Sequence, residues 1–353
     1  MPPTLTTTVV LFSSAEEYFA TASRELRGAF PTASLERLGP DIGALSVPGM
    51  SLSEVAELVR GRPIAFVRHL SEELRRIPVA EATPGAVAEA AVRVVGQRWP
   101  SGQDISVQCW VSGKSPVDYG SRELFESIST ALAEQGYPVR RGGTDGVLSA
   151  SVSNGAVSIG FAATADALSD WPGGRVRLAK REELISRAEL KLEEAIGVFD
   201  LRLPARGSAV DLGASPGGWT SILLRHGLEV WAVDPGDLDQ RLVGRPRVHH
   251  ERTTSGQFFA TSRRRFDLAV NDMRMDPELS CSVMLDAADH LAAGAPAVIT
   301  LKLGLHRPLE TVDRCFALLR RRYEVLGARQ LQHNRHEITV LCRRAAARSG
   351  RGE

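Results

Sequence analysis

A glycine-rich segment in the second half of the chain has the residue types of a nucleotide-binding turn. Residues 210–220 read VDLGASPGGWT and lie between an apolar, strand-like run and a helical stretch. Small residues let a backbone approach a ligand closely, and the start of a helix offers free N–H groups. Asp234 ends the next apolar run, where a carboxylate can accept hydrogen bonds from ribose hydroxyls. The turn and this acid together predict a site for a nucleoside cofactor.

The same segment argues against two common nucleotide-binding motifs. It lacks the Gly-x-Gly-x-x-Gly spacing of dinucleotide-binding folds, and no Gly-Lys-Ser or Gly-Lys-Thr of a P-loop follows it. A dehydrogenase that uses a nicotinamide cofactor is therefore disfavoured.

Lysine is scarce in this chain, so the positions that keep it are informative. Of the 43 basic residues only four are lysines, namely Lys114, Lys180, Lys191 and Lys302. Arginine in such excess is typical of a GC-rich coding sequence. An arginine keeps its proton near neutral pH, whereas a desolvated lysine can release it. A lysine that such a chain retains is therefore a candidate for proton chemistry.

The glycine-rich segment resembles the cofactor loop of the FtsJ-type family of S-adenosylmethionine-dependent RNA ribose 2′-O-methyltransferases. The activity of that family rests on a Lys–Asp–Lys–Glu tetrad. Matching motifs occur here in the expected order as SRAELKL, NDM, LKL and RHEITV. The resemblance covers residues 180–345. It implies a catalytic tetrad of Lys191, Asp272, Lys302 and Glu337.

The resemblance also implies a role for each member of the tetrad. A sulfonium methyl group is already electrophilic, so the difficult step is to make a ribose 2′-hydroxyl nucleophilic and to hold it in line. A buried lysine near a second cation can accept or share the hydroxyl proton, and we assign this role to Lys302. Lys191 and Glu337 would position the hydroxyl and tune Lys302. Asp272 would hold Lys302 and lie near the sulfonium; which lysine is the formal base stays open.

Cofactor contacts are expected from the glycine-rich turn and from neighbouring strand ends. Ser255 occupies a position where the family often has an acid that contacts the adenine amino group, so adenine would be read here by a hydroxyl or by the backbone. Trp219 could stack on the cofactor or pack against the helix start. The expected contact residues are Asp211, Gly213, Ala214, Ser215, Pro216, Gly217, Gly218, Trp219, Asp234, Ser255 and Asp272.

Residues 175–353 alternate apolar strands with helical stretches, which predicts an α/β fold. We expect a Rossmann-like methyltransferase domain with a doubly wound, seven-stranded, mostly parallel sheet whose last two strands are antiparallel to each other. The expected strands are 209–212, 229–233, 247–250, 267–270, 297–301, 323–330 and 337–343.

Two smaller α+β domains are expected before it. Residues 1–80 have a βαβαβ-like order and would form a ferredoxin-like domain, with strands at 9–12, 42–47 and 64–67 and helices at 15–28 and 51–60. Residues 81–168 resemble a THUMP RNA-binding domain, with helices at 86–95 and 121–135 and strands at 105–111, 147–152 and 156–161. Asn154-Gly155 predicts a type I′ hairpin between the last two strands. Residues 166–175 are rich in turn formers, and we expect them to form an interdomain linker.

Composition excludes several classes of protein. No apolar run is long enough to span a membrane, no secretory signal is visible, and the four cysteines form no CxxC pair. No HExxH motif occurs, so we expect a cytoplasmic protein without a metal and favour a monomer. The net charge of +1 arises from 14 basic and 18 acidic residues in 1–169 and from 29 basic and 24 acidic residues in 170–353. The acidic first part is unusual for an RNA-binding module.

The order of ferredoxin-like, THUMP and FtsJ-type domains is that of the RlmM-type family. The resemblance implies methylation of a cytidine 2′-hydroxyl in large-subunit (23S) ribosomal RNA. Two alternatives remain open at this point: a tRNA 2′-O-methyltransferase, and a non-catalytic RNA-binding factor for ribosome assembly that keeps the methyltransferase fold. The complete tetrad argues against the second alternative, whereas the serine at position 255 argues for it.

Overall fold

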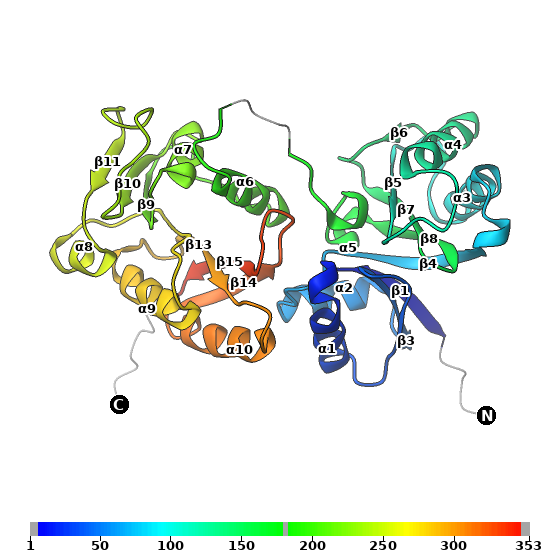
Figure 1. Cartoon of the computed structure of the whole chain (residues 1–353), viewed down its shortest axis with the longest axis horizontal. Coiled ribbons are helices and arrows are strands. Elements are labelled where there is room, and N and C mark those ends of the chain that lie inside the picture. The colour runs from blue at the N-terminus through cyan, green and yellow to red at the C-terminus, as the bar shows by residue number, and fades with distance from the viewer. Residues whose placement is uncertain (1–5, 179–182, 347–353) are drawn as a thin grey trace. The chain divides into compact units, whose positions relative to one another are not determined.

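The chain forms two compact units, residues 1–177 and residues 178–353 (Figure 1). The structure is a computed structural model, and it describes residues 6–178 and 183–346. Lys180 lies outside the described residues.

A single eight-stranded sheet runs through the N-terminal unit, in the order β2-β3-β1-β4-β8-β7-β5-β6. The long strand β4 pairs with β1 on one side and with β8 on the other, so the sheet continues across the expected boundary at residue 80. The ferredoxin-like and THUMP-like domains therefore stay predictions. The strands are β1 (Thr7–Ser13), β2 (Ser34–Arg37), β3 (Ile42–Pro48), β4 (His69–Pro78), β5 (Ile105–Val111), β6 (Val139–Arg140), β7 (Gly146–Val152) and β8 (Ala156–Ala163).

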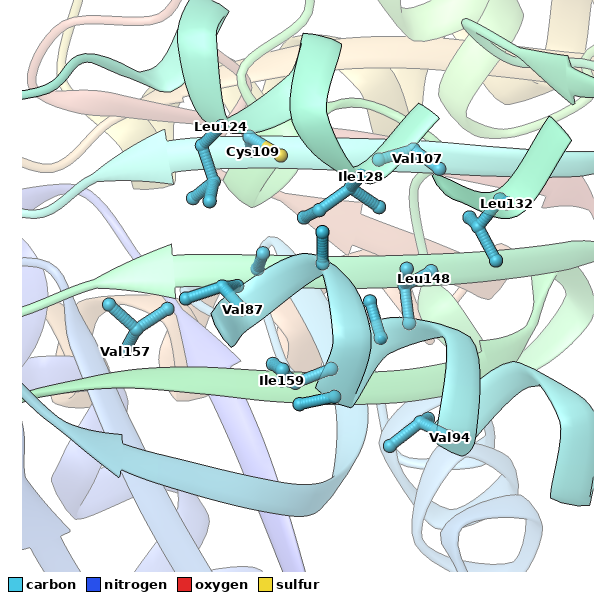
Figure 2. Packing of buried hydrophobic residues seen from close by; sticks show 14 of the residues in the cluster. Val87, Val94, Val107, Cys109, Leu124, Ile128, Leu132, Leu148, Val157 and Ile159 are labelled. Atoms are coloured by element: carbon cyan, nitrogen blue, oxygen red, sulfur yellow. The ribbon is translucent and has the colours of Figure 1, made fainter. Parts of the chain in front are cut away.

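Helices of the N-terminal unit bury apolar faces on this sheet. Valine and leucine side chains of α3 and α4 interdigitate with those of β5, β7 and β8 (Figure 2). The expected capping box at Ser51 is present, because its hydroxyl accepts from the Glu54 N–H at 3.3 Å and the Glu54 carboxylate accepts from the Ser51 N–H at 2.7 Å. The helices are α1 (Phe19–Ala29), α2 (Leu52–Gly61), α3 (Pro84–Arg98), α4 (Ser121–Glu134) and α5 (Thr164–Ala167).

Two local expectations for this unit are wrong. Residues 64–67 form no strand, because the Glu25 carboxylate accepts from the N–H groups of Ala65 and Phe66 at 2.7 and 3.0 Å and so takes the place of a strand partner. The β7–β8 hairpin is present, but neither Asn154 nor Gly155 has a positive φ. A type I′ turn needs positive φ at both positions, so this turn is of another type.

Residues 166–175 pack onto the N-terminal unit instead of extending as a linker. The Gly173 carbonyl accepts from the Ser13 hydroxyl at 2.8 Å, and Arg175 forms an ion pair with Asp41. Gly174 adopts φ +68°, and a Cβ there would lie 2.6 Å from the Cβ of Arg68. These contacts bring the end of the N-terminal unit to Arg177.

The seven strands expected in the C-terminal unit are all present. Their order is β11-β10-β9-β12-β13-β15-β14. β15 pairs antiparallel with β13 and β14, and all the other pairs are parallel. This confirms the doubly wound sheet. Strand order reverses between β9 and β12, and such a switch point opens a ligand crevice at the carboxyl edge. The strands are β9 (Ser208–Leu212), β10 (Glu229–Val233), β11 (Val248–Glu251), β12 (Leu268–Asn271), β13 (Pro296–Lys302), β14 (Tyr323–Arg329) and β15 (Glu337–Arg344).

Helices cover both faces of this sheet, with α6 and α7 on one face and α9 and α10 on the other (Figure 1). Leu192 of α6 and Leu223 of α7 are fully buried against apolar residues of the central strands. This packing fixes α6 over the sheet. None of the helices within the described residues is long and apolar enough to cross a bilayer. The helices are α6 (Ala188–Val198), α7 (Gly218–Arg225), α8 (Ser255–Thr261), α9 (Pro277–Ala287) and α10 (Pro308–Leu319).

Candidate active site

The fold brings the four tetrad residues to one place at the carboxyl edge of the C-terminal sheet. Asp272 directly follows β12, Lys302 ends β13, and Glu337 begins β15. The antiparallel register of β13 and β15 sets Lys302 directly opposite Glu337. Lys191 reaches the same edge from helix α6.

The four side chains form a closed ring of alternating charge. The Lys302 Nζ lies 2.5 Å from Asp272 Oδ1 and 2.5 Å from Glu337 Oε2. The Lys191 Nζ lies 3.2 Å from Asp272 Oδ2 and 2.7 Å from Glu337 Oε1. Each lysine Nζ therefore bridges both carboxylates, and we call these four residues the tetrad ring.

Burial and charge act in opposite directions on the tetrad ring. Exposed fractions of its side chains lie between 8% for Glu337 and 23% for Lys302. Burial lowers the pKa of Lys191, but the Asp272 and Glu337 carboxylates outweigh it, so the pKa lies above its usual value. Burial raises the pKa of Asp272, but Lys302 and Lys191 outweigh it and hold the pKa below its usual value. At neutral pH Lys191 is therefore charged and Asp272 is ionised.

Thr300 completes the contacts of Lys302 and was not found from the sequence. The Lys302 Nζ donates to Thr300 Oγ1 at 2.6 Å, and that hydroxyl donates to Asp272 Oδ1 at 2.6 Å. Residues two apart on a strand point to the same face, so this position could have been inferred from Lys302.

The turn before Glu337 is held by two further residues. Asn334 Nδ2 donates to Glu337 Oε1 at 3.4 Å. The Glu194 side chain is only 1% exposed, and it accepts from the N–H groups of Gln332 and His333 at 2.7 and 2.9 Å. Glu194 lies three residues after Lys191, so one helix both presents a tetrad lysine and anchors the turn that leads to Glu337. No signal in the sequence links Glu194 to this turn.

The glycine-rich turn after β9 exposes backbone at the same edge. Gly213 adopts φ +76°, and a Cβ there would lie 2.4 Å from Met273 Cγ and 3.1 Å from Met273 Cα, so only glycine fits. Ser215 Oγ donates to the Asp237 carbonyl at 2.8 Å, which ties the turn to the segment after β10. The Ser215–Pro216 peptide bond is cis, and Gly217 adopts φ +111° just before α7.

Two acids border this turn in different ways. Asp234 is half-buried and accepts from the N–H groups of Ser215 and Gly236 at 3.3 and 2.6 Å. A carboxylate has about four acceptor sites, so Asp234 can still accept from ribose hydroxyls. Asp211 is 1% exposed and accepts from the Thr220 hydroxyl at 2.6 Å. Burial raises the pKa of Asp211 to about 7.

Other expected cofactor residues differ in how much side chain they present. The Trp219 side chain is buried in the core, and its Nε1 donates to the Ala188 carbonyl at 2.8 Å, so the ring packs against α6. Ala214 is buried, and a Cβ on Gly218 would lie 2.2 Å from Ser186 Oγ. Ser255 is half-buried and is the first residue of α8.

These residues fit a nucleoside cofactor. The turn offers closely approachable backbone at Gly213 and Ser215, and the half-exposed Asp234 carboxylate lies on the neighbouring strand end. Met273, the residue after Asp272, lies against Gly213, so the tetrad ring borders this turn. Within the described residues, no cluster of three or more His, Cys, Asp or Glu side chains could hold a metal ion.

Residues 184–331 match the family model described as FtsJ-like methyltransferase. The C-terminal unit contains an FtsJ-like methyltransferase domain. S-adenosylmethionine is the cofactor of this methyltransferase family. The match takes in Lys191, Asp272 and Lys302, and it ends before Glu337.

Relatives of the FtsJ-like domain carry the name ribosomal RNA large subunit methyltransferase M. The protein of that name from Halorhodospira halophila is 41% identical over 182 residues, which cover 51% of this chain and 53% of the relative. The one from Alkalilimnicola ehrlichii is 35% identical over 238 residues, which cover 65% of this chain and 64% of the relative. The second match is longer than residues 178–353, so it also includes part of the N-terminal unit. The chain spans about half the length of the first of these relatives.

Similarity to solved structures is low. TrmN from Thermus thermophilus is 16% identical and aligns with 96% of this chain and 99% of its own length, at a TM-score of 0.38.

Proposed function

We propose that this chain transfers a methyl group from S-adenosylmethionine to a ribose 2′-hydroxyl of RNA. The observation that carries the proposal is the tetrad ring, in which two lysines and two carboxylates contact one another beside the glycine-rich turn. A non-catalytic assembly factor would have no need to keep all four residues in contact in a half-buried site. The intact ring therefore favours an enzyme over that alternative.

Within the tetrad ring, the proposed acceptor of the hydroxyl proton is Lys302 in its neutral amine form, which becomes the ammonium as the 2′-oxygen attacks the methyl group. When bound, S-adenosylmethionine supplies a methyl group on a sulfonium that needs no further activation. Lys191 is suited to carry a charge, because the ring carboxylates raise its pKa. Asp272, Glu337 and Thr300 fix the position of the Lys302 Nζ. Holding the nucleophile and the proton acceptor in one fixed geometry is a large part of the rate gain available to such a site.

Asp234 and the backbone of the glycine-rich turn are the proposed contacts for the cofactor's ribose and methionine parts. Asp211, Gly213, Ala214, Pro216, Gly217 and Gly218 shape this turn, and Ser255 is the proposed contact on the adenine side. Trp219 supports the turn from the core, because its indole N–H is already bonded to Ala188.

The proposed substrate is a cytidine of large-subunit (23S) ribosomal RNA. The relatives named ribosomal RNA large subunit methyltransferase M support this choice over tRNA. We propose RNA binding for the N-terminal unit, as ferredoxin-like and THUMP-like domains, because a match to one of those relatives extends into it. We also propose that the protein is a monomer, that it is cytoplasmic and that it acts without a bound metal.

A methyl-transfer assay with purified RNA tests the substrate. The chain is incubated with radiolabelled S-adenosylmethionine and with large-subunit rRNA, small-subunit rRNA or tRNA from cells that lack the protein. We expect label only in large-subunit rRNA and only as a 2′-O-methylated cytidine after nuclease digestion. Label in tRNA would favour the tRNA alternative, and label on a base would contradict the proposed chemistry.

A further inference from the structure

Three arginines lie on the loops that leave the sheet edge beside the tetrad ring. Arg274 follows β12, Arg307 follows β13, and Arg335 precedes β15. These strands are adjacent in the sheet, and β15 runs opposite to β13, so all three loops leave the same edge. All three arginines are exposed.

These arginines are not neutralised within the described part of the chain. None of them forms an ion pair with another described residue. Apart from Asp272 of the tetrad ring, the acid in these loop sequences is Asp276, whose carboxylate caps α9 by accepting from the N–H groups of Glu278 and Leu279 at 2.9 and 3.1 Å. The exposed edge beside the ring is therefore positively charged.

The cofactor side of the same edge is different. There, Arg241 is paired with Asp239 at 2.8 Å, and Arg252 is paired with Asp237. Positive charge is thus balanced next to the glycine-rich turn and unbalanced on the far side of the tetrad ring. A polyanion would be attracted to the second side only.

An exposed leucine lies among the arginines. Leu305 is 58% exposed, in the loop that directly follows Lys302. The N–H groups of Leu303 and Gly304 donate to the His336 carbonyl at 2.9 and 3.2 Å, which fixes this loop to the residue before Glu337. Single exposed leucines are common, but one held next to a half-buried site and between basic residues can pack on an unstacked base.

We propose that Arg274, Arg307 and Arg335 bind the phosphates that flank the target nucleotide and that Leu305 packs against a neighbouring base. This proposal rests on the proposed function, and it narrows the substrate of the methyl transfer to an unpaired stretch of RNA. The tetrad side chains are at most 23% exposed, so the target ribose must enter a recess. A nucleotide splayed out of a single strand can do so more easily than one stacked in a duplex.

Binding of a short fluorescein-labelled single-stranded RNA, measured by anisotropy over a range of salt concentrations, tests the surface. The variants are the full chain with Arg274→Gln, Arg307→Gln and Arg335→Gln combined, and the full chain with Leu305→Ser. Arg343→Gln is the matched control, because Arg343 lies on β15 at the opposite end of the strand and pairs with Glu324. Thermal unfolding and S-adenosylmethionine binding confirm that each variant folds.

The triple variant should bind RNA at least about tenfold more weakly, and its salt slope should fall by about 0.7 for each lost phosphate contact. Leu305→Ser should weaken binding at every salt concentration without changing the slope, and a matching duplex should bind the wild-type chain more weakly. Arg343→Gln should change nothing. An unchanged affinity and slope in the triple variant would overturn this surface even if the wild-type chain methylates RNA. If the wild-type chain shows the expected slope but transfers no methyl group, the proposed function fails and the surface stands.

Discussion

At the scale of single residues, Lys302 is held by a hydroxyl as well as by two carboxylates. Removing the hydroxyl in Thr300→Val should leave the Lys302 Nζ without one of its three fixed partners. Because a small loss of positioning is costly in a preorganised site, we expect kcat to fall roughly tenfold to a hundredfold. Affinity for S-adenosylmethionine, measured by calorimetry, should stay the same.

Thr300→Ser is the matched control for this position. It keeps the hydroxyl and should restore most of the lost kcat. Equal loss in the serine and valine variants would mean that Thr300 contributes through packing and not through its bond to Lys302.

Asp211 predicts a dependence of stability on pH. Its pKa is raised to about 7 by burial, above the value of 3.8 expected without burial. The folded state therefore holds this proton more tightly, and stability is lost as pH rises from about 4 to about 7. Asp211→Asn removes the charge and keeps an acceptor for the Thr220 hydroxyl. We therefore compare the melting temperature of this variant with that of the wild-type chain at each pH. The variant's advantage over the wild-type chain should be several degrees larger at pH 8 than at pH 5. An equal difference in melting temperature between variant and wild type at pH 5 and at pH 8 would contradict the raised pKa of Asp211.

The tetrad residues could be predicted because their motifs are local, whereas their supports could not. Lys302 and Glu337 each follow from a few neighbouring letters of sequence. Glu194 and Asn334 act on a turn formed by the chain's return to the sheet, and no local pattern reports such a contact.

At the scale of elements, α6 links Lys191 to the turn before Glu337 through Glu194. Glu194→Gln removes the charge that accepts from three donors of Gln332 and His333. A buried charged acceptor of this kind contributes about 1–3 kcal/mol, so the free energy of unfolding should fall by that amount in denaturant titrations. The rate of methyl transfer should also fall, because the turn that positions Glu337 would lose its anchor.

Glu278→Gln is the control for this prediction. Glu278 pairs with Arg314, and both side chains are exposed, so the loss of this pair should cost less than about 1 kcal/mol. A Glu194→Gln chain as stable and active as the Glu278→Gln chain would contradict the anchoring role of Glu194.

Strands were predictable where burial gives a continuous apolar run, as in β9 or β13. The expected strand at 64–67 shows the limit of that signal. Its residues are as apolar and as buried as a strand, but the Glu25 carboxylate satisfies two of their N–H groups. The exposed strand β2 has no apolar run and was missed for the opposite reason.

At the scale of the whole molecule, the two units should separate after Arg177. A fragment of residues 178–353 contains the complete sheet, the tetrad ring and the glycine-rich turn. We expect it to fold cooperatively and to bind S-adenosylmethionine about as tightly as the full chain, while its affinity for large-subunit rRNA falls at least tenfold. Calorimetry and filter binding measure the two affinities.

A fragment that begins at residue 169 should be less stable than the one that begins at residue 178. It keeps Trp171 to Arg175 without the N-terminal residues on which this segment packs.

Full affinity of the 178–353 fragment for rRNA would contradict the RNA-binding role proposed for the N-terminal unit.

Methyl transfer through Lys302 is the core of the proposed function, and mapping of ribose methylation in cells tests it most directly. Ribosomal RNA and tRNA are compared from cells that lack the protein and that are complemented with the wild-type chain or with Lys302→Arg. We predict a 2′-O-methylated cytidine in large-subunit rRNA that appears with the wild-type chain and stays absent with Lys302→Arg, because arginine keeps its proton. Restoration of that methyl group by Lys302→Arg, or an unchanged methylation pattern in cells without the protein, would contradict the account.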